Sequence, residues 1–248
     1  MAHLIGLITW DRLHLTSITA PINLNPQRWG IDPDDVTVMW VDNGSTPANY
    51  KAMSKLILPD CKLRHRKNHG IGRAINDICH MAFHMMGVDY VTTIANDIIE
   101  PQNYLLHRQE AIEAIENTGV CSIKVNDAAT FGTKRQDGVQ YEENVLISGN
   151  HTIPRTTFER IGYQYEGYGI YAPIDFDYCA RAQATGLRTY QLSGVIAKHL
   201  GNNNDQEYQQ QKNASHYAAM PEYRARLETY RRGHNLYYKP YRYEVPER

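Results

Sequence analysis

The stretch from Tyr90 to Pro101 contains an apolar, β-branched run that ends abruptly in Asn96 and Asp97. Such a run, preceded by Gly87 and followed by a proline, is typical of a strand that is buried on both faces of a parallel sheet. The carboxylate that ends the run then lies at the carboxyl edge of the sheet, where open α/β sheets bind their ligands. A carboxylate at a strand end can also simply cap the next helix. The stretch therefore predicts an α/β fold and makes Asp97 a candidate site residue.

Two earlier runs have the same form. Residues 4–9 and residues 36–41 predict buried strands, and the second of these is followed directly by Asp42. The Asn-Gly pair after Asp42 predicts a tight turn, and Thr46 and Pro47 supply the cap and the first residue of a helix. A carboxylate between strand and helix can accept hydrogen bonds from a ribose or from the edge of a base. The alternative is a capped turn that holds no ligand.

Glycines mark the start of the next predicted helix. Apolar residues recur at helical spacing from Ile71 to Met85, and Gly87 follows as the helix end. Gly70 lies at the beginning of this helix, where the backbone can approach a diphosphate closely. Arg73 is either a phosphate ligand or part of a solvated face. Because a single G-x-G is a weak motif, it supports a nucleotide site only together with other signals.

The remaining sequence alternates between predicted helices and strands. Two acids, Asp175 and Asp177, begin a helix that Gly186 closes, and the helix dipole alone would explain both of them. His199 ends the last apolar strand, where it is either structural or a metal ligand beside a carboxylate. The other predicted elements are a helix opened by Pro101, strands at 120–125 and 145–149, a mobile loop at 126–144, a short strand and helix at 153–162, and a strand at 189–197.

Composition limits the classes of protein that remain. The chain has 248 residues, 42% of them hydrophobic, and a net charge of −1, which supports a folded domain and argues against a dedicated nucleic-acid binder. Four scattered cysteines indicate reduced thiols, and no apolar run reaches membrane-spanning length, so we expect a soluble, cytoplasmic protein with no integral membrane association. Residues 206–248 are polar, then helical at 221–232, then rich in tyrosine and arginine; we expect them to form a C-terminal extension of a domain at 1–205.

Taken in order, these pieces resemble the family 2 glycosyltransferases over about residues 3–205. The resemblance implies the GT-A fold, an α/β/α nucleotide-binding sandwich around a mostly parallel mixed sheet. It also implies sugar transfer from a nucleotide-sugar with inversion at the anomeric carbon. The matching positions are Thr9, Asp42-Asn43-Gly44-Ser45-Thr46, Asn68-x-Gly70 with Asn76, Asn96-Asp97, Gly149 with Arg155-x-x-Phe158 and Gly162, Asp175-x-Asp177 with Arg181 and Gly186, and His199-x-Gly201.

The resemblance assigns roles to individual residues. It implies that Asp97 and His199 hold Mn²⁺ or Mg²⁺ on the donor diphosphate, and that Asp175 is the general base that deprotonates the acceptor hydroxyl. Ala95 and Ile174 depart from the family pattern, because many members carry acids at these two positions. The implied donor-nucleotide ligands are Thr9, Asp42, Asn68, Gly70, Arg73 and Asn96, and the implied acceptor or sugar contacts are Gly149, Glu166 and Asp177.

The spacing of the two helix-start acids makes them unequal. Asp175 and Asp177 are separated by one residue, so on a helix their side chains point about 200° apart and only one of them can face the donor sugar. We expect Asp177 to pair with Arg181 one turn later, in which case it is structural.

Other functions remain open from the sequence. A sugar-nucleotide nucleotidyltransferase also places metal-binding acids on such a sheet, but it usually begins with a glycine-rich basic loop where this chain has Trp10-Asp11-Arg12. A non-catalytic binding relative of the fold is a second alternative. The donor is UDP-, GDP- or dTDP-linked, and the acceptor is a saccharide, a glycolipid, a protein or a DNA base. The tail at 237–243 suits acceptor recognition and a homo-oligomer contact equally.

Overall fold

The computed structural model describes residues 1–143, 147, 149–171, 173–201 and 206–243. In this part of the chain the strands form one ten-stranded sheet in the order β3-β2-β1-β4-β9-β6-β10-β8-β7, with β5 paired to β10. β1 to β4 run parallel, β10 runs parallel to β6, and β9 is antiparallel to both β4 and β6. The strands are β1 His3–Thr9, β2 Val36–Asp42, β3 Cys61–Arg64, β4 Tyr90–Ala95, β5 Ile98–Ile99, β6 Thr118–Val125, β7 Thr133–Gln136, β8 Val139–Glu143, β9 His151–Pro154 and β10 Arg188–His199.

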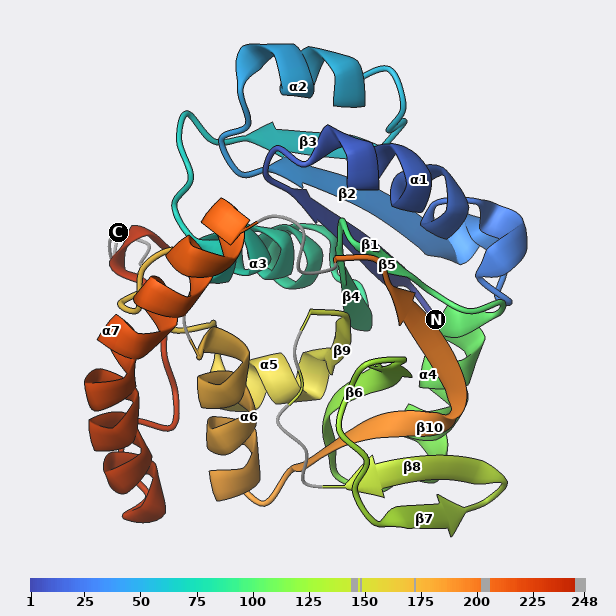
Figure 1. Cartoon of the computed structure of the whole chain (residues 1–248). Helices are drawn as coiled ribbons and strands as arrows, with labels where there is room; N and C mark the ends of the chain where they lie inside the picture. The colour runs from blue at the N-terminus through green and yellow to red at the C-terminus, as the bar shows by residue number, and fades with distance from the viewer. Residues whose placement is uncertain (144–146, 148, 172, 202–205, 244–248) are drawn as a thin grey trace.

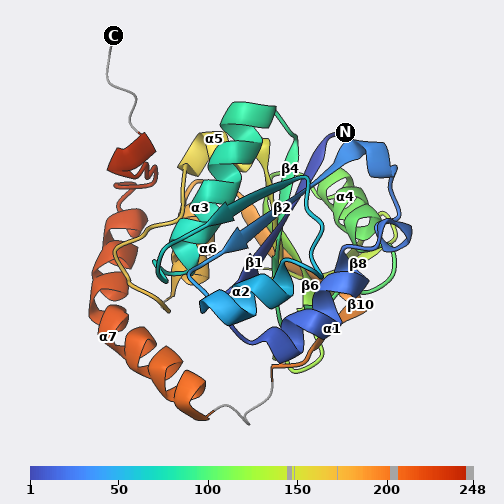
Figure 2. The same ribbon diagram turned by 90° about the horizontal axis from the view of Figure 1, so that it is seen from above.

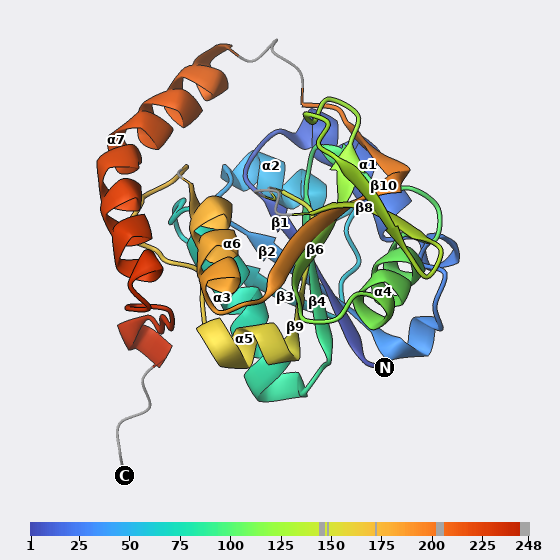
Figure 3. The same ribbon diagram turned by 90° about the horizontal axis from the view of Figure 1, so that it is seen from below.

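Helices cover both faces of the sheet and make a layered sandwich (Figure 1). One face carries α1 (Leu13–Asn23), α2 (Pro47–Met53) and α4 (Tyr104–Ala114), and the other carries α3 (Ile71–His80), α5 (Arg155–Ile161) and α6 (Ile174–Ala184) (Figure 2). α7 (Gln206–Arg231) packs outside α6 as a further layer (Figure 3). The shorter elements are 3₁₀ turns at Pro26–Arg28, Pro33–Asp35 and Tyr241–Tyr243 and a π-helical turn at Met81–Met86.

β1 shows why the apolar runs predict buried strands. All seven of its residues are buried. Leu4 and Ile8 pack in the cluster beneath α3, whereas Ile5 and Leu7 pack in the clusters on the opposite face. Because successive side chains of a strand point to opposite faces, a strand that is covered on both faces needs apolar residues throughout. The predicted strands at 4–9, 36–41 and 90–95 are confirmed as β1, β2 and β4.

α2 and α3 begin at the carboxyl edge of the sheet, at the cap and glycine residues that the sequence predicted for their N-termini. Thr46 accepts a hydrogen bond from the backbone N–H of Asn49 at 3.4 Å, and Pro47 is the first residue of α2. Gly70 precedes α3 with a φ of 91°, and a Cβ at this position would lie 2.4 Å from the carbonyl oxygen of Gly169. Only glycine tolerates both the conformation and this close approach. α3 therefore begins directly against the loop at 165–171.

The prediction of a mobile loop at 126–144 is wrong, because most of this segment forms a β-hairpin. β7 and β8 pair antiparallel around Asp137 and Gly138, whose φ values of 47° and 84° are typical of two-residue hairpin turns. β8 also pairs with β10, so the hairpin extends the sheet. The segment is polar because β7 is an exposed edge strand, and not because it lacks regular structure.

Several predicted boundaries also differ from the structure. The helix expected to open at Pro101 begins at Tyr104, and Asn103 before it has a left-handed φ of 59°. The C-terminal helix, predicted at 221–232, begins at Gln206 and contains Pro221. Most of the strand predicted at 145–149 lies outside the described residues. None of the described helices combines the length and the apolar character needed to cross a membrane.

The C-terminal extension packs against the sandwich. α7 buries Ala219 and Tyr223 against α6 and the loop before it. Beyond α7 the chain returns to the end of α5, where the backbone N–H of Tyr238 donates to the carbonyl of Ile161 at 3.1 Å. The carbonyl of Tyr238 in turn accepts from the backbone N–H of Tyr163 at 2.8 Å. These bonds hold the tail on the same side of the molecule as α3 and α6.

Candidate active site

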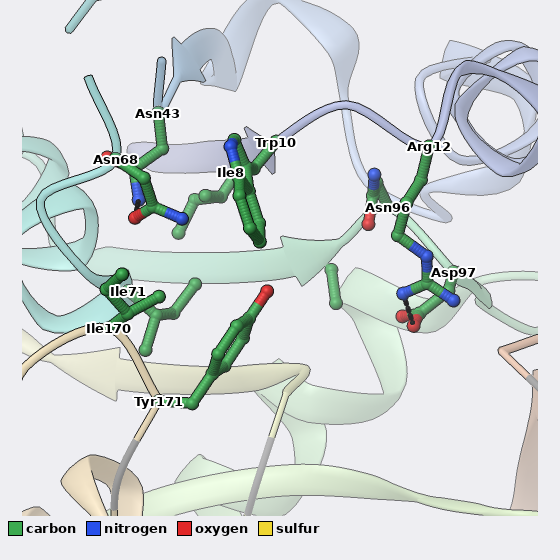
Figure 4. A pocket seen from close by; sticks show the side chains of 11 residues that line it. Ile8, Trp10, Arg12, Asn43, Asn68, Ile71, Asn96, Asp97, Ile170 and Tyr171 are labelled. Carbon is green, nitrogen blue, oxygen red and sulfur yellow. Dashed lines mark hydrogen bonds and ion pairs between the residues drawn. The ribbon is translucent and has the colours of Figure 1, made fainter. Parts of the chain in front are cut away.

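An open pocket lies at the carboxyl ends of β1 and β4, the edge at which the sequence predicts ligand binding. Arg12 and Asp97 form one end of it, and Asn43 and Asn68 form the other (Figure 4). The pocket is therefore charged at one end and neutral but polar at the other. Its lining consists of Ile8, Trp10, Arg12, Asn43, Asn68, Ile71, Ala95, Asn96, Asp97, Ile170 and Tyr171.

Trp10 and Tyr171 form an aromatic pair between the two ends of the pocket. No sequence pattern indicated this pair. Their ring centroids are 6.1 Å apart and their planes are tilted by 49°. Trp10 follows β1, and Tyr171 comes from the loop before α6, where its backbone N–H donates to the Oγ of Ser215 on α7 at 3.0 Å. Rings at this position offer flat apolar faces to a base or a sugar ring.

Asp97 and His199, the two predicted metal ligands, lie side by side at the charged end. The Nε2 of His199 is 3.5 Å from the Oδ2 of Asp97, because β5 pairs antiparallel with the end of β10 and so brings their strand ends together. The Nη1 of Arg12 donates to the same carboxylate oxygen at 2.8 Å. On its other side, the Nδ1 of His199 lies 2.8 Å from the Oδ2 of Asp127.

The charges of this cluster shift the pKa values of its members. Burial raises the pKa of the Asp97 carboxyl, but the hydrogen bond to His199 and the charge of Arg12 outweigh burial, and the pKa lies below its ordinary value. The hydrogen bond to Asp97, aided by the one to Asp127, raises the pKa of His199 to about 9. A cation must therefore displace a proton from His199 at neutral pH, because a metal-bound imidazole nitrogen carries no proton.

Gly201 leaves space beside the two ligand atoms. A Cβ at Gly201 would lie 2.6 Å from the Oδ2 of Asp97 and 2.9 Å from the Nε2 of His199. A carboxylate oxygen and an imidazole nitrogen suit Mn²⁺, and the oxygen suits Mg²⁺. Within the described ranges, no group of three or more His, Cys, Asp and Glu side chains is arranged to hold a metal. The pair therefore fits an ion that takes its remaining ligands from a substrate and from water.

Amide groups make the neutral end of the pocket. The Nδ2 of Asn43 donates to the Oδ1 of Asn68 at 2.9 Å and to the carbonyl of Gly70 at 3.1 Å. The Oδ1 of Asn68 also accepts from the backbone N–H of Gly70 at 2.8 Å. Two side-chain amides and the start of α3 thus meet at one place. Asn68 and Asn96, which we predicted as donor ligands, line the pocket; Asn43 also lines it, although its sequence context indicated no role beyond a turn and a position that matches the family.

Asp42 and Thr9, which we predicted as donor ligands, do not line this pocket. The side chain of Asp42 is 0% exposed, and it accepts from the backbone N–H of Ser45 and from the Nε of Arg64, each at 3.3 Å. The Oγ1 of Thr9 lies 3.4 Å from Asp42 and accepts from the indole N–H of Trp40 at 2.9 Å. These contacts are those of the capped turn, the alternative that the sequence left open.

Asp175 lies in the first turn of α6, outside the lining of the pocket. A backbone N–H bond from Gly149 reaches its carboxyl group, but its Oδ1 is buried and has no hydrogen-bond partner among the described residues. Burial raises the pKa of Asp175 from 3.8 to about 7. The side chain shares a small cavity with His151 and Gln164, and the charge of Lys212 on α7 reaches it. A carboxyl group with a pKa near 7 is suited to exchange protons at neutral pH.

Five further predicted site residues lie outside the pocket lining: Gly70, Arg73, Gly149, Glu166 and Asp177. Asp177 is 0% exposed and pairs with the Nε of Arg181 at 2.9 Å, as the helical spacing predicts. Glu166 pairs with Arg242 of the tail. Partners within the protein thus contact both carboxylates. Arg73 lies on α3 but is not part of the lining.

Comparison with known proteins identifies the fold. No protein-family profile matches the sequence, and no curated protein matches it. Among solved structures, the chain is similar to the mannosyltransferase PcManGT from Pyrobaculum calidifontis in complex with GDP-Man and Mn²⁺, with a TM-score of 0.62 and 16% identity over 87% of this chain and 61% of that chain. It is also similar to GalNAc-T7 with UDP, GalNAc and Mn²⁺, with a TM-score of 0.59 and 10% identity over 80% of this chain and 44% of that chain. The chain thus spans less than two thirds of each of these proteins, and it has the GT-A glycosyltransferase fold.

Proposed function

We propose that this protein is a metal-dependent, inverting glycosyltransferase that moves a sugar from a nucleotide-sugar donor to an acceptor hydroxyl. The observation that carries the proposal is the convergence of Asp97 and His199, beside the space left by Gly201, at the edge of a pocket in a GT-A fold. Both similar structures contain Mn²⁺, one with GDP-Man and one with UDP, which supports a nucleoside diphosphate sugar as the donor here.

The two ends of the pocket suit the two parts of such a donor. Asp97 and His199 would hold Mn²⁺ or Mg²⁺, whose charge would stabilise the diphosphate as it leaves. Arg12 adds a fixed positive charge beside them. At the other end, Asn68 supplies a side-chain amide for hydrogen bonds to the nucleoside, and Asn43 holds that amide in place through its own bond to Asn68.

Asp175 is the proposed general base. As the acceptor oxygen forms its bond to the anomeric carbon, the carboxylate takes the hydroxyl proton, and the bond between that carbon and the diphosphate oxygen breaks with its electron pair. Attack from the face opposite the leaving group inverts the anomeric configuration. Because Asp175 lies outside the pocket lining, this role requires the acceptor to approach beside α6 rather than through the nucleoside end.

We expect Asp97→Asn to weaken the binding of Mn²⁺ and of the donor by about 100-fold while the protein stays folded. An amide removes the negative charge that faces the cation, although it keeps the shape of the side chain. The measurement is calorimetric titration with Mn²⁺ and then with UDP, GDP and dTDP, followed by a screen of sugar nucleotides for release of the nucleoside diphosphate.

Asp127→Asn is the matched control for this variant. Asp127 contacts the far nitrogen of His199, so its loss should weaken Mn²⁺ binding by about tenfold, at the low end of the usual cost for such a partner. Unchanged Mn²⁺ affinity in Asp97→Asn, or full activity in EDTA, would contradict the metal assignment. Release of pyrophosphate in place of a nucleoside diphosphate would indicate a nucleotidyltransferase instead.

Removal of the ring of Tyr171 should weaken donor binding. If Trp10 and Tyr171 enclose a planar part of the donor, Tyr171→Ala should raise the donor KM about tenfold or more, since stacking of a base on an aromatic ring contributes about 1–3 kcal/mol. Tyr171→Phe keeps the ring and should bind the donor nearly as well as the wild type. Equal donor KM values for the two variants would show that the ring pair takes no part in binding.

A further inference from the structure

We propose that the C-terminal tail positions the amide end of the donor pocket through a continuous series of hydrogen bonds. The series runs from Tyr243 and Arg242 in the tail through Asp77 and His65 to Asn43 in the pocket. The proposal rests on the proposed function, because it makes these tail residues determinants of donor affinity. They act through Asn43 and are therefore positioning residues.

The contacts of Asn43 fix the direction in which its side-chain amide faces. Its Oδ1 accepts from the backbone N–H of His69 at 3.2 Å, and its Nδ2 donates to the carbonyl of Gly70 at 3.1 Å. A backbone N–H only donates and a carbonyl only accepts, so a reversed amide would oppose both groups. Because the same Nδ2 donates to Asn68, the orientation of Asn43 also sets that of the second pocket amide.

His65 joins Asn43 to the next residue of the series. Its Nδ1 is 2.7 Å from the Oδ1 of Asn43, and its Nε2 is 2.8 Å from the Oδ2 of Asp77. Both partners are oxygen acceptors, so a ring that donates from both nitrogens satisfies both contacts. His65 is only 8% exposed, so water offers little alternative to these partners. A change in the position of Asp77 would therefore move His65 and, through it, the Asn43 side chain in the pocket.

Asp77 is held in turn by the tail. The hydroxyl of Tyr243 donates to the Oδ1 of Asp77, and the Nη2 of Arg242 lies 3.3 Å from the same oxygen. The ring of Tyr243 stacks against the rings of His80 and Tyr163, with centroid distances of 4.3 and 4.7 Å. The tail is therefore fixed by packing as well as by polar bonds.

This arrangement gives the tail a role in donor affinity rather than in the chemical step. A side-chain amide at a pocket edge can rotate, and fixing it before the donor arrives removes an entropy cost from binding. Asn68, which Asn43 orients, lies at the end of the pocket away from Asp97, so its orientation should change donor binding and not the reacting centre. It also means that Arg242 and Tyr243 already have partners within the protein, in contrast to the acceptor contact that the sequence suggested for the tail.

The test compares four full-length variants by calorimetric titration, in Mn²⁺, with the nucleoside diphosphate that the wild type binds. Asp77→Leu and the double variant Arg242→Met with Tyr243→Phe break the series at two points. In Asp77→Asn the side-chain oxygen still accepts from Tyr243 and Arg242, and the amide N–H donates to the Nε2 of His65, which accepts while its Nδ1 still donates to Asn43. Tyr241→Phe changes an adjacent tail residue that is 86% exposed and is not part of the series.

We expect the two breaking variants to bind the nucleoside diphosphate about tenfold more weakly, which corresponds to the loss of about one hydrogen bond. Their donor KM should rise to the same extent while kcat stays unchanged. Asp77→Asn and Tyr241→Phe should bind within about twofold of the wild type, because neither breaks the series. Thermal unfolding identifies a variant that is not folded; if Asp77→Leu is one, the double variant and Tyr241→Phe decide the test by themselves.

Three outcomes would overturn the proposal and leave the proposed function intact. These are equal donor affinity in the breaking variants and their controls, equal losses in Asp77→Leu and Asp77→Asn, or a fall in kcat with an unchanged KM. If the wild type itself binds no nucleoside diphosphate in Mn²⁺, the proposed function fails as well, and this is seen before any variant is compared.

Discussion

The variant Asp175→Asn is expected to lower the turnover of sugar transfer by about 10²–10⁴-fold while it binds the donor normally. An amide cannot take the proton of the acceptor hydroxyl, but the donor keeps its contacts in the pocket, whose lining does not include Asp175. The measurement is kcat at saturating donor and acceptor, together with the dissociation constant of the donor. Turnover near that of the wild type would mean that the base lies elsewhere or that transfer does not invert.

The stability of the same variant provides an independent check that it is folded. Because burial raises the pKa of Asp175 from 3.8 to about 7, the folded protein holds a proton between these pH values that the unfolded chain releases. The folded state therefore loses stability as the pH rises through this window, and the loss is complete above pH 7. Asp175→Asn cannot lose this proton. Its melting temperature should exceed that of the wild type above pH 7 and match it below pH 3.8.

Asp177→Ala should destabilise the protein by about 3–5 kcal/mol, the usual cost of removing one partner of a buried ion pair. Within the part of the chain that the structure describes, four residues donate to the Asp177 carboxylate: Arg181 at 2.9 Å, Arg226 at 3.1 Å, and the hydroxyls of Tyr168 at 2.7 Å and Tyr230 at 2.6 Å. Asp177→Asn should also be costly, because its amide N–H groups would face donors. Denaturant unfolding measures the loss.

Glu228→Gln is the matched control on α7. Glu228 pairs with Arg231, but both side chains are more than half exposed, and such surface pairs contribute about 0–1 kcal/mol. A loss in Asp177→Ala no larger than that in Glu228→Gln would show that the buried cluster is not a major source of stability. Asp177 on α6 hydrogen-bonds both to α7 and to the 165–171 loop. Its loss should therefore also loosen this loop, which places Tyr171 in the pocket.

The elements that the sequence predicted best are those whose burial pattern is local. β1, β2 and β4 are covered on both faces, and a continuous apolar run is the direct result of that burial. The hairpin of β7 and β8 was missed, although Asp137-Gly138 is a strong hairpin signal, because its polar residues suggested a loop. A polar side chain indicates that a residue is exposed to solvent. It does not indicate secondary structure, because exposed residues occur in both strands and loops.

The candidate site was predictable only in part for a similar reason. The adjacency of Asp97 and His199 followed from strand ends and from the family resemblance, and the structure shows the two side chains together. Asp42 also stands at a strand end, yet its carboxylate turns inward, and nothing in the pattern distinguishes it from Asp97. Asn43 and Tyr171 were missed because their positions depend on the folding of distant segments against each other.

The short strand β9 has a consequence for how the protein is made. It lies between β4 and β6, and it pairs with three residues of β4 and two of β6. During synthesis β4 leaves the ribosome well before β9, so one of its edges offers unpaired N–H and C=O groups that other chains can bind. β10 follows later still, and only its arrival brings His199 to Asp97. Any affinity for a cation at these two residues therefore arises at the end of folding, after the last strand has left the ribosome.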